Sequence, residues 1–232
     1  MAEQFSGCLV CGKPLIYLEQ PEEMVCSLCG ARQESYAKCE DGHFICDACH
    51  MQKGLETIQS ICLQSQSKNP IKIAQQIMAQ PFIYLHGPEH HTLVGAVLLT
   101  ACKNAGLDFS LAESLAEMEQ RGKKIPGGVC GFNGCCGAAV SAGTFLSILM
   151  GATPLSGKDW GLCNLLTGKC LERIGILGGP RCCKRDSFTA ILTAVDFLEE
   201  YLGIQLETNE KVVCSFSKEN KECIHKKCPY FA

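Results

Sequence analysis

Nineteen of the 232 residues are cysteine, and this feature constrains the chain more than any other. An odd number of thiols cannot all be paired within one chain, and the first seven residues lack the basic and apolar regions of a signal peptide. We therefore expect a cytoplasmic protein whose thiols stay reduced for metal binding or thiol chemistry. The cysteine zones predict three parts: a zinc-finger module over residues 1–52, a cysteine-rich helical domain over 53–210 and a metal-binding tail over 211–232.

The first part carries four close pairs of metal ligands. Two cysteines separated by two residues can bind one tetrahedral zinc ion from a tight turn, and two such pairs are followed by a second set that contains a histidine. The eight ligands are Cys8, Cys11, Cys26, Cys29, Cys39, His43, Cys46 and Cys49. They predict two zinc ions, and His50, which follows directly, is not expected to bind either of them.

Two arrangements fit this spacing. In a sequential, ribbon-like module, the first four ligands hold one ion and the last four hold the other. In a cross-brace module, the first and third pairs share one ion, and the second and fourth pairs share the other. The sequence leaves both open, but in either case a segment of about 50 residues is too short to bury a sufficient core, so the metal must supply folding energy.

The charge distribution argues against a nucleic-acid partner. The formal net charge of the whole chain is −3, and acidic residues outnumber basic ones in the N-terminal part. If the module has a role besides its own folding, docking to a protein is therefore the better hypothesis.

Apolar residues recur at helical spacing through the middle part. The expected helices cover about 55–62, 70–78, 90–105, 111–120, 134–150, 158–174 and 188–202, and strands are expected only around Tyr17 and over 211–214. The predicted fold class is mainly α, with a helical bundle as the core. Residues 134–155 are uncharged and long enough to cross a bilayer, but their hydroxyl, thiol and glycine content favours a buried helix and no membrane association.

Two glycine-rich loops and one histidine-rich loop each precede a predicted helix. They read GGVCGFNGCCGAA over 127–139, GGPRCCKRD over 178–186 and HGPEHHT over 86–92. Because a helix N-terminus stabilises a thiolate, we expect lowered thiol pKa values here, and we expect the three loops to converge on one pocket. The predicted ligands of a [4Fe-4S] cluster or metal ion are Cys130, Cys135, Cys136, Cys182 and Cys183. The predicted catalytic residues are Cys130, Cys136, Cys183, His90, His91, Arg181, Lys184 and Arg185.

The remaining cysteines divide into two groups. Cys214, Cys223 and Cys228 in the tail predict a metal knuckle, with Pro229 after the last ligand as in ferredoxins. Three thiolates do not close a site, so His225 or a distant cysteine must complete it, and the metal is left open. The others lie on apolar helix faces and are expected to be core residues: Cys62, Cys102, Cys163 and Cys170.

The loop motifs and the segment 86–99 resemble an uncharacterised, cysteine-rich prokaryotic family of unknown function, over about residues 80–205. More weakly, residues 130–143 resemble the C-GCAxxG-C-C proteins, a helical family suspected of redox or metal work. Here a Cys-Cys-Gly-Ala-Ala sequence stands where that pattern has one cysteine. The resemblance implies no specific reaction, but such families often accompany anaerobic metalloenzymes.

Two functions follow as hypotheses. The first is a metal-dependent thiol protein, with iron–sulfur or zinc centres, that acts in redox or sulfur-transfer chemistry. The second is a non-catalytic zinc adaptor or metal carrier that docks a partner metalloenzyme through its N-terminal module. The glycine-rich loops match neither a P-loop nor a dinucleotide fingerprint.

Overall fold

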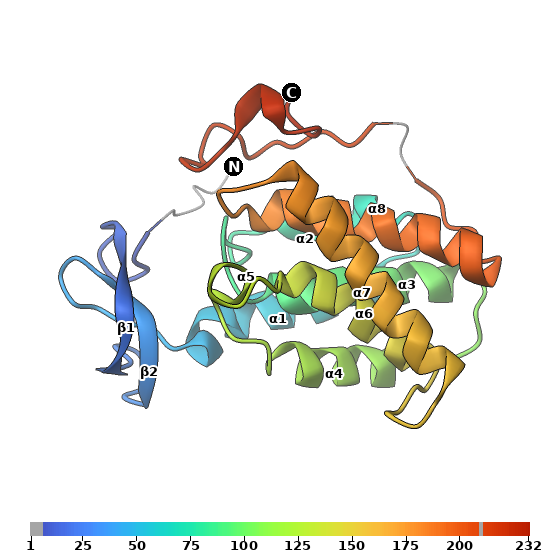
Figure 1. Cartoon of the computed structure of the whole chain (residues 1–232), viewed down its shortest axis with the longest axis horizontal. Coiled ribbons are helices and arrows are strands. Elements are labelled where there is room, and N and C mark those ends of the chain that lie inside the picture. Colours follow the sequence, from blue (N-terminus) through green and yellow to red (C-terminus); the bar gives the residue numbers. More distant parts are fainter. Residues whose placement is uncertain (1–6, 209–210) are drawn as a thin grey trace.

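The computed structural model describes residues 7–208 and 211–232. A small two-stranded module lies at one end of a helical bundle, and the C-terminal tail returns from the far end of the last long helix toward its start (Figure 1). The predicted fold class, a mainly helical core with a small N-terminal module, is confirmed. Residues 1–6 lie outside the described residues, and they make up most of the stretch that lacks the features of a signal peptide.

The N-terminal module is one antiparallel hairpin. Strand β1 (Leu15–Val25) pairs with β2 (Arg32–Cys39), from Leu15 opposite Cys39 at the open end to Val25 opposite Arg32 at the turn. The register shifts between Tyr17 and Glu22. The module's buried apolar cluster is small, made of Met24, Cys26, Phe44 and Cys46. So small a core cannot hold the hairpin by hydrophobic burial alone.

The rest of the described chain contains eight α-helices and one 3-10 turn, joined by loops. They are α1 (Asp47–Gln64), α2 (Pro70–Met78), α3 (His90–Asn104), α4 (Leu111–Gly122), α5 (Val129–Phe132), α6 (Gly137–Leu149), α7 (Lys158–Leu177), α8 (Cys183–Leu202) and η1 (His225–Lys227). The start of α2 is fixed by Asn69, whose side chain accepts hydrogen bonds from the N–H groups of Ile71 and Lys72, and by Pro70 in the first turn.

Two local predictions were wrong. The predicted helix over 134–150 is preceded by the separate turn α5 and begins only at Gly137, because Gly134 adopts a positive φ of 63° that ends the first helix. The predicted strand over 211–214 is a loop. The N–H of Cys214 donates to the carbonyl of Tyr230 at 2.7 Å, and β1 and β2 form the only ladder in the described chain.

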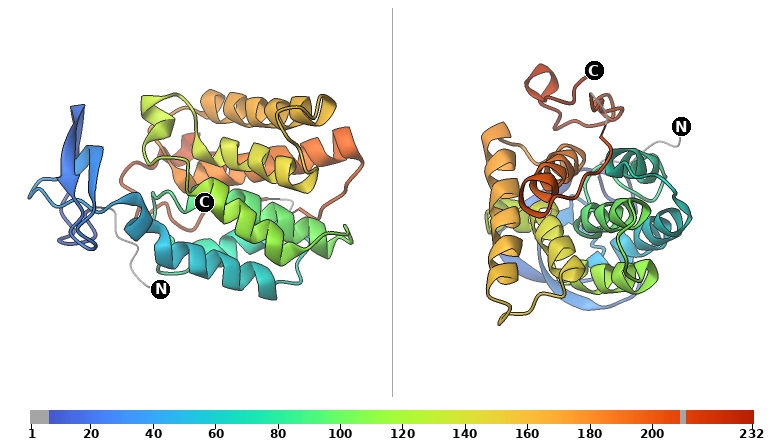
Figure 2. Two further views of the ribbon diagram at one scale, coloured as in Figure 1. Left: turned by 90° about the horizontal axis from the view of Figure 1, so that it is seen from below. Right: turned by 90° about the vertical axis from the view of Figure 1, so that its right-hand side faces the viewer.

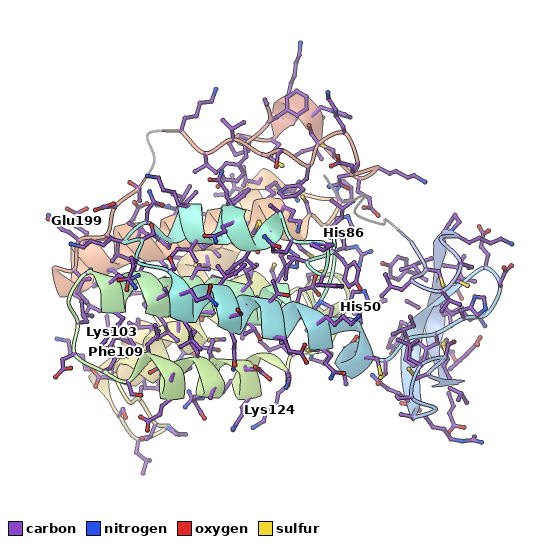
Figure 3. All side chains as sticks on the ribbon, turned by 180° about the vertical axis from the view of Figure 1, so that it is seen from behind. His50, His86, Lys103, Phe109, Lys124 and Glu199 are labelled. Carbon is purple, nitrogen blue, oxygen red and sulfur yellow. The ribbon has the colours of Figure 1, made fainter. Side chains whose placement is uncertain are left out.

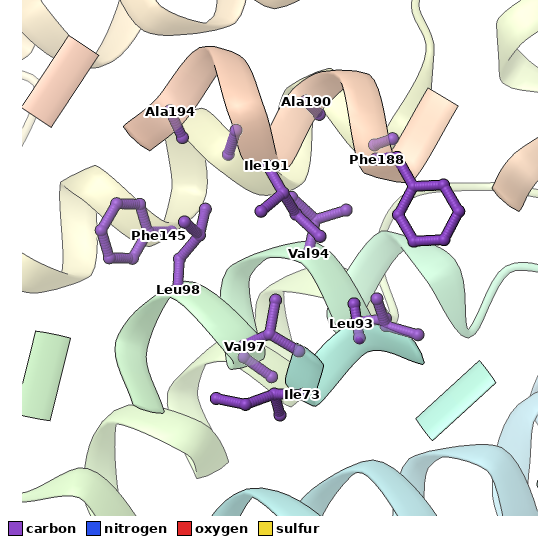
Figure 4. Packing of buried hydrophobic residues seen from close by; sticks show 14 of the residues in the cluster. Ile73, Leu93, Val94, Val97, Leu98, Phe145, Phe188, Ala190, Ile191 and Ala194 are labelled. Atoms are coloured by element: carbon purple, nitrogen blue, oxygen red, sulfur yellow. The ribbon is translucent and has the colours of Figure 1, made fainter. Parts of the chain in front are cut away.

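Helix α3 is the centre of the bundle. Its residues from His90 to Cys102 are all buried, as expected for a helix that is covered on every side. Figure 4 shows its apolar side chains between Ile73 of α2 and the apolar face of α8. The cysteines predicted to be core residues lie in the same cluster: Cys62, Cys102 and Cys170 are fully buried, and Cys163 packs against it from the edge.

The uncharged segment that contains α6 is an interior helix of this bundle. At Gly143, a Cβ atom would lie 1.9 Å from the Thr167 hydroxyl and 3.0 Å from the Cys163 carbonyl, so α6 and α7 can approach closely only with glycine there. Across the described ranges 7–208 and 211–232, no helix combines the length and apolar character needed to cross a membrane.

Candidate metal centres

Two groups of four ligands lie in the N-terminal module. The first group is Cys8, Cys11, Cys39 and His43, and the second is Cys26, Cys29, Cys46 and Cys49. Within each group all ligand atoms lie within 4.8 Å of one another. Both groups could hold a metal ion, and they pair the ligands as a cross-brace module does.

The hairpin explains this pairing. Antiparallel pairing places Cys39, at the end of β2, beside the start of β1, so the ligand pair before β1 meets the pair that begins with Cys39. The second pair lies at the turn of the hairpin. The chain after His43 folds back to it, with the N–H of Ser27 donating to the Phe44 carbonyl at 2.8 Å and the N–H of Cys46 donating to Cys26 Sγ at 3.4 Å.

The distances match a mononuclear zinc site. With zinc–sulfur bonds of about 2.3 Å, the edge of a tetrahedron joins two sulfur atoms about 3.8 Å apart. The Sγ atoms of Cys11 and Cys39 lie 3.9 Å apart, and those of Cys29 and Cys46 lie 3.7 Å apart. The Nδ1 atom of His43 lies 3.4 Å from Cys39 Sγ, close to the expected nitrogen–sulfur edge of about 3.6 Å. The residues therefore fit zinc in both sites.

Backbone N–H groups donate hydrogen bonds to thiols of the module and so favour the binding of a cation. Burial of the Cys26 thiol would raise its pKa, but N–H donors from Cys46, Cys29 and Leu28 outweigh burial and lower the pKa to about 6. The N–H of Val10 donates to Cys8 Sγ at 3.4 Å in the same way. A thiolate is the form that binds zinc, so this environment favours metal binding.

Helix α1 joins the module to the bundle (Figure 2). Cys46 is its N-cap residue and Cys49 lies in its first turn, so two ligands of the second site belong to the start of α1. The helix also runs through the predicted boundary at residue 52 without interruption. The division into three domains stays a prediction.

The three loops predicted to converge do so at the end of the bundle that faces the module (Figure 1). Gly137 at the start of α6 faces His91 of α3, where an added Cβ would lie 2.2 Å from the imidazole. Cys136 Sγ lies 3.9 Å from Asp186 Oδ2 in the first turn of α8. We refer to residues 86–92, 135–139 and 181–187 as the helix-start cluster.

The expectation of lowered thiol pKa values in this cluster was wrong. Burial raises the pKa of Cys136 to about 12, and the nearby Asp186 carboxylate adds to the effect. Burial likewise raises the pKa of Cys182 to about 11 and that of Cys183 further. Removing a thiolate from water costs more free energy than the partial positive charge at the helix N-terminus supplies, so burial determines the direction of the pKa shift.

The predicted histidines are buried and hydrogen-bonded to backbone. The Nδ1 atom of His90 lies 3.1 Å from the Gly87 carbonyl, and that of His91 lies 3.0 Å from the Ile125 carbonyl. Burial lowers the pKa of both imidazoles, so both are neutral near pH 7. A neutral imidazole at these distances donates to the carbonyl and fixes its loop.

Two acidic residues of this region, Glu89 and Asp186, were not among the predicted site residues. Glu89 is fully buried, accepts a hydrogen bond from the N–H of Tyr84 at 3.0 Å and lies 3.7 Å from His50 Nδ1. Burial opposes ionisation of Glu89, but the histidines His50 and His90 outweigh it and lower its pKa. Glu89 is one of only two acidic residues within the three loop motifs, the other being Asp186, and that was the available signal.

The predicted cationic residues are placed differently from one another. Arg185 donates to the carbonyls of Gly178 and Pro180 at 2.8 and 2.9 Å and pairs with Asp186. Lys184 is buried and donates to the Ile83 carbonyl at 2.9 Å. Only Arg181 faces the module, where its guanidinium lies 5.5 Å from the ring centre of Tyr17.

A cavity of about 210 Å³ lies where module, bundle and tail meet. Arg181 and Tyr17 line it together with three side chains that were not predicted to be site residues: His50, Tyr84 and His86. His50 and His86 lie on the bundle side of this junction (Figure 3). Glu222 of the tail also lines it, and the Glu222 carboxylate lies 2.5 Å from His86 Nε2.

The five loop cysteines do not gather around one ion. Within the part of the chain that the structure describes, only the two module groups place three or more ligand atoms within 4.8 Å. Cys182 lies apart from the others and lines a cavity with the three tail cysteines. Cys130 in α5 and Cys135 just after it are half-buried. The role of these residues as cluster ligands stays a prediction.

One family profile matches most of the chain. No curated protein and no solved structure is significantly similar to the chain. A sequence profile described as a family of unknown function (DUF5714) matches residues 58–231, about three quarters of the chain. The match includes the helix-start cluster and the tail and begins after the metal-binding module. The chain therefore belongs to this family of unknown function, DUF5714.

Proposed function

We propose that this chain is a metal-thiolate protein that acts in redox or sulfur-transfer chemistry, with two zinc ions folding the N-terminal module. The observation that carries the proposal is the sulfur-to-sulfur spacing of 3.9 and 3.7 Å in two interleaved ligand groups. Each site has four protein ligands, which leaves no open position for a substrate, so the zinc is structural.

The chemistry is assigned to the helix-start cluster. The carboxylate of Asp186 accepts the contact from the Cys136 thiol at 3.9 Å, and burial raises the pKa of Asp186 above its ordinary value. A more basic carboxylate is a better proton acceptor when the thiol becomes a nucleophile. The adjoining cavity, which Arg181 and Lys221 line, would receive a small reactant.

Metal analysis tests the zinc part. The purified chain should hold about two zinc ions, and Cys11→Ser and Cys29→Ser should each lose about one. Cys163→Ser, which alters a half-buried thiol in α7, is the matched control and should keep both. A wild-type chain without zinc, or a Cys29→Ser variant with full zinc content, would overturn this part.

Sulfur loading tests the chemical part. Reduced protein is incubated anaerobically with inorganic polysulfide, and mass spectrometry then locates persulfide on individual cysteines. Sulfur-transfer chemistry predicts loading at Cys136 that is lost in Cys136→Ser and weakened in Asp186→Asn. Loading confined to cysteines outside the helix-start cluster would contradict the assignment.

A zinc adaptor or metal carrier is the second candidate. The module exposes the apolar side chains of Val10, Val25 and Leu28, of which Leu28 is 64% exposed, and this favours docking to a partner metalloenzyme. It predicts that Cys130→Ser and Cys136→Ser keep function in a complementation assay, while Leu28→Asp removes it. The reverse pattern favours thiol chemistry.

A further inference from the structure

Four cysteines from two distant parts of the chain line one cavity. Cys182, the N-cap residue of α8, meets Cys214, Cys223 and Cys228 of the tail. The cavity is small, with a volume of about 20 Å³. Its lining also includes Phe216, Ile224, Tyr230 and Phe231. An apolar wall around four thiols is typical of a buried metal centre and excludes water from it.

The backbone around the tail cysteines repeats the geometry of the N-terminal metal sites. In the module, the N–H two residues after Cys8 or Cys26 donates to that sulfur at 3.4 and 3.5 Å. In the tail, the N–H two residues after Cys214 or Cys223 donates to that sulfur at 3.4 Å in both cases. The tail sulfur atoms therefore accept the same backbone hydrogen bond as the ligands of the module.

His225 supplies a second indication. It is the only non-glycine residue with positive φ in the described parts of the chain, at 47°, and its N–H is the one that donates to Cys223. Left-handed backbone at such a residue is unfavourable and is kept where the surrounding structure requires it.

The tail is held firmly against the bundle, so the four cysteines have fixed positions. The hydroxyl of Tyr230 lies 3.0 Å from Thr189 Oγ1 of α8, and the ring of Tyr230 packs edge-on against Phe188. Asn220 of the tail donates from Nδ2 to Cys182 Sγ of the bundle at 3.4 Å. Val212 is buried in the same apolar cluster as the bundle core.

We propose that Cys182, Cys214, Cys223 and Cys228 form a third metal centre, which holds an iron–sulfur cluster between the start of α8 and the tail. No three of these sulfur atoms lie within 4.8 Å of one another, whereas all four ligand atoms of each module site do. The four thiolates therefore do not form a compact mononuclear set like those of the module, and in a cluster each thiolate binds a different iron atom. The proposal does not rest on the proposed function, since it shares no ligand with the module.

Lys184 provides the charge that such a centre requires. Its ammonium group is buried, lines the same cavity and lies 4.7 Å from the ring centre of Phe216. Four thiolates around an iron–sulfur core carry net negative charge, which a buried cation offsets. The predicted role of Lys184 as a catalytic residue is thereby replaced, in this proposal, by a role in holding the cluster.

The test compares two adjacent cysteines. Full-length wild type, Cys182→Ser and Cys183→Ser are reconstituted anaerobically with ferrous iron and sulfide, and iron, sulfide and zinc are measured together with the visible absorption band. Wild type and Cys183→Ser should hold between about two and four iron atoms per chain, with equal sulfide. Cys182→Ser should lose most of this iron. Cys183 is the matched control because it does not line the cavity.

Zinc in the same samples reports on folding of the module. Cys228→Ser should also lose iron while keeping the module's zinc, which separates loss of the cluster from a general failure to fold. The proposal is overturned if wild type takes up no iron, if it binds a third zinc ion in place of iron, or if Cys182→Ser keeps the wild-type iron content. Because zinc and iron are counted separately, a failure here is distinguishable from a failure of the two-zinc proposal.

Discussion

Cys29 Sγ lies 3.7 Å from Cys46 Sγ, which brings the turn of the N-terminal hairpin to the N-cap residue of α1. A metal ion between them would tie the module to the bundle, since Cys49 in the first turn of α1 belongs to the same candidate site. The first group of ligands has no member in a helix. The two sites therefore differ in what their loss would do.

Loss of the second site should loosen the start of α1. In Cys49→Ser, we expect faster amide hydrogen exchange over about residues 50–55, because metal binding no longer fixes the first turn. Cys11→Ser, which removes a ligand of the first site, should leave exchange in α1 near the wild-type rate. Equal acceleration in both variants would show that the module responds as one unit.

Gly137 should not tolerate a side chain. Gly137→Ala places a Cβ atom 2.2 Å from the His91 ring, so we expect a loss of about 1–3 kcal/mol in the free energy of unfolding from overpacking. Gly168→Ala in α7 is the matched control: it meets no atom within 4 Å and should stabilise the chain by up to about 1 kcal/mol. Chemical denaturation of both variants measures the difference. A neutral Gly137→Ala would contradict the close contact between α3 and α6.

The cap of α2 should contribute more than the cap of α4. Asn69 is buried and accepts two hydrogen bonds at 3.0 and 3.1 Å, so Asn69→Ala should cost about 1–2 kcal/mol in the free energy of unfolding. Ser110 accepts one longer bond of 3.4 Å at an exposed site, and Ser110→Ala should cost about 0.5 kcal/mol. Denaturant titrations at one pH compare the two, and the reverse order would be inconsistent with these caps.

Stability should fall in mild acid because of buried imidazoles. Burial lowers the pKa of His91 below its ordinary value of about 6.5, so the unfolded chain takes up a proton that the folded chain does not. The free energy of unfolding should therefore decrease as the pH falls below about 6.5, by up to about 1.4 kcal/mol per pH unit for one such group.

His91→Gln tests this dependence. It removes the titrating group, so the slope between about pH 5.5 and pH 7 should be shallower than in wild type. Zinc content is measured at each pH, since protonation of the module's ligands would lower stability in both proteins alike. If the two slopes coincide at equal zinc content, His91 does not contribute to the acid sensitivity.

The sequence by itself indicated most of the helices, the core and the candidate metal ligands of the module. These depend on local patterns: apolar residues at helical spacing, capping residues such as Asn69, and cysteine pairs two residues apart. The family resemblance over about 80–205 was also visible in the loop motifs, and the match over 58–231 extends it to the tail.

Only the tertiary structure decided which ligands meet and in which direction the pKa of each buried thiol shifts. The antiparallel register brings Cys39 to Cys11 and so selects the cross-brace pairing, which spacing along the chain leaves open. Burial likewise reversed the expected pKa shift at Cys136, because solvent exclusion depends on neighbours from other helices. Cys182 and Cys183 are equivalent in the sequence, yet only Cys182 lines the cavity of the tail, since the two side chains leave the start of α8 in different directions.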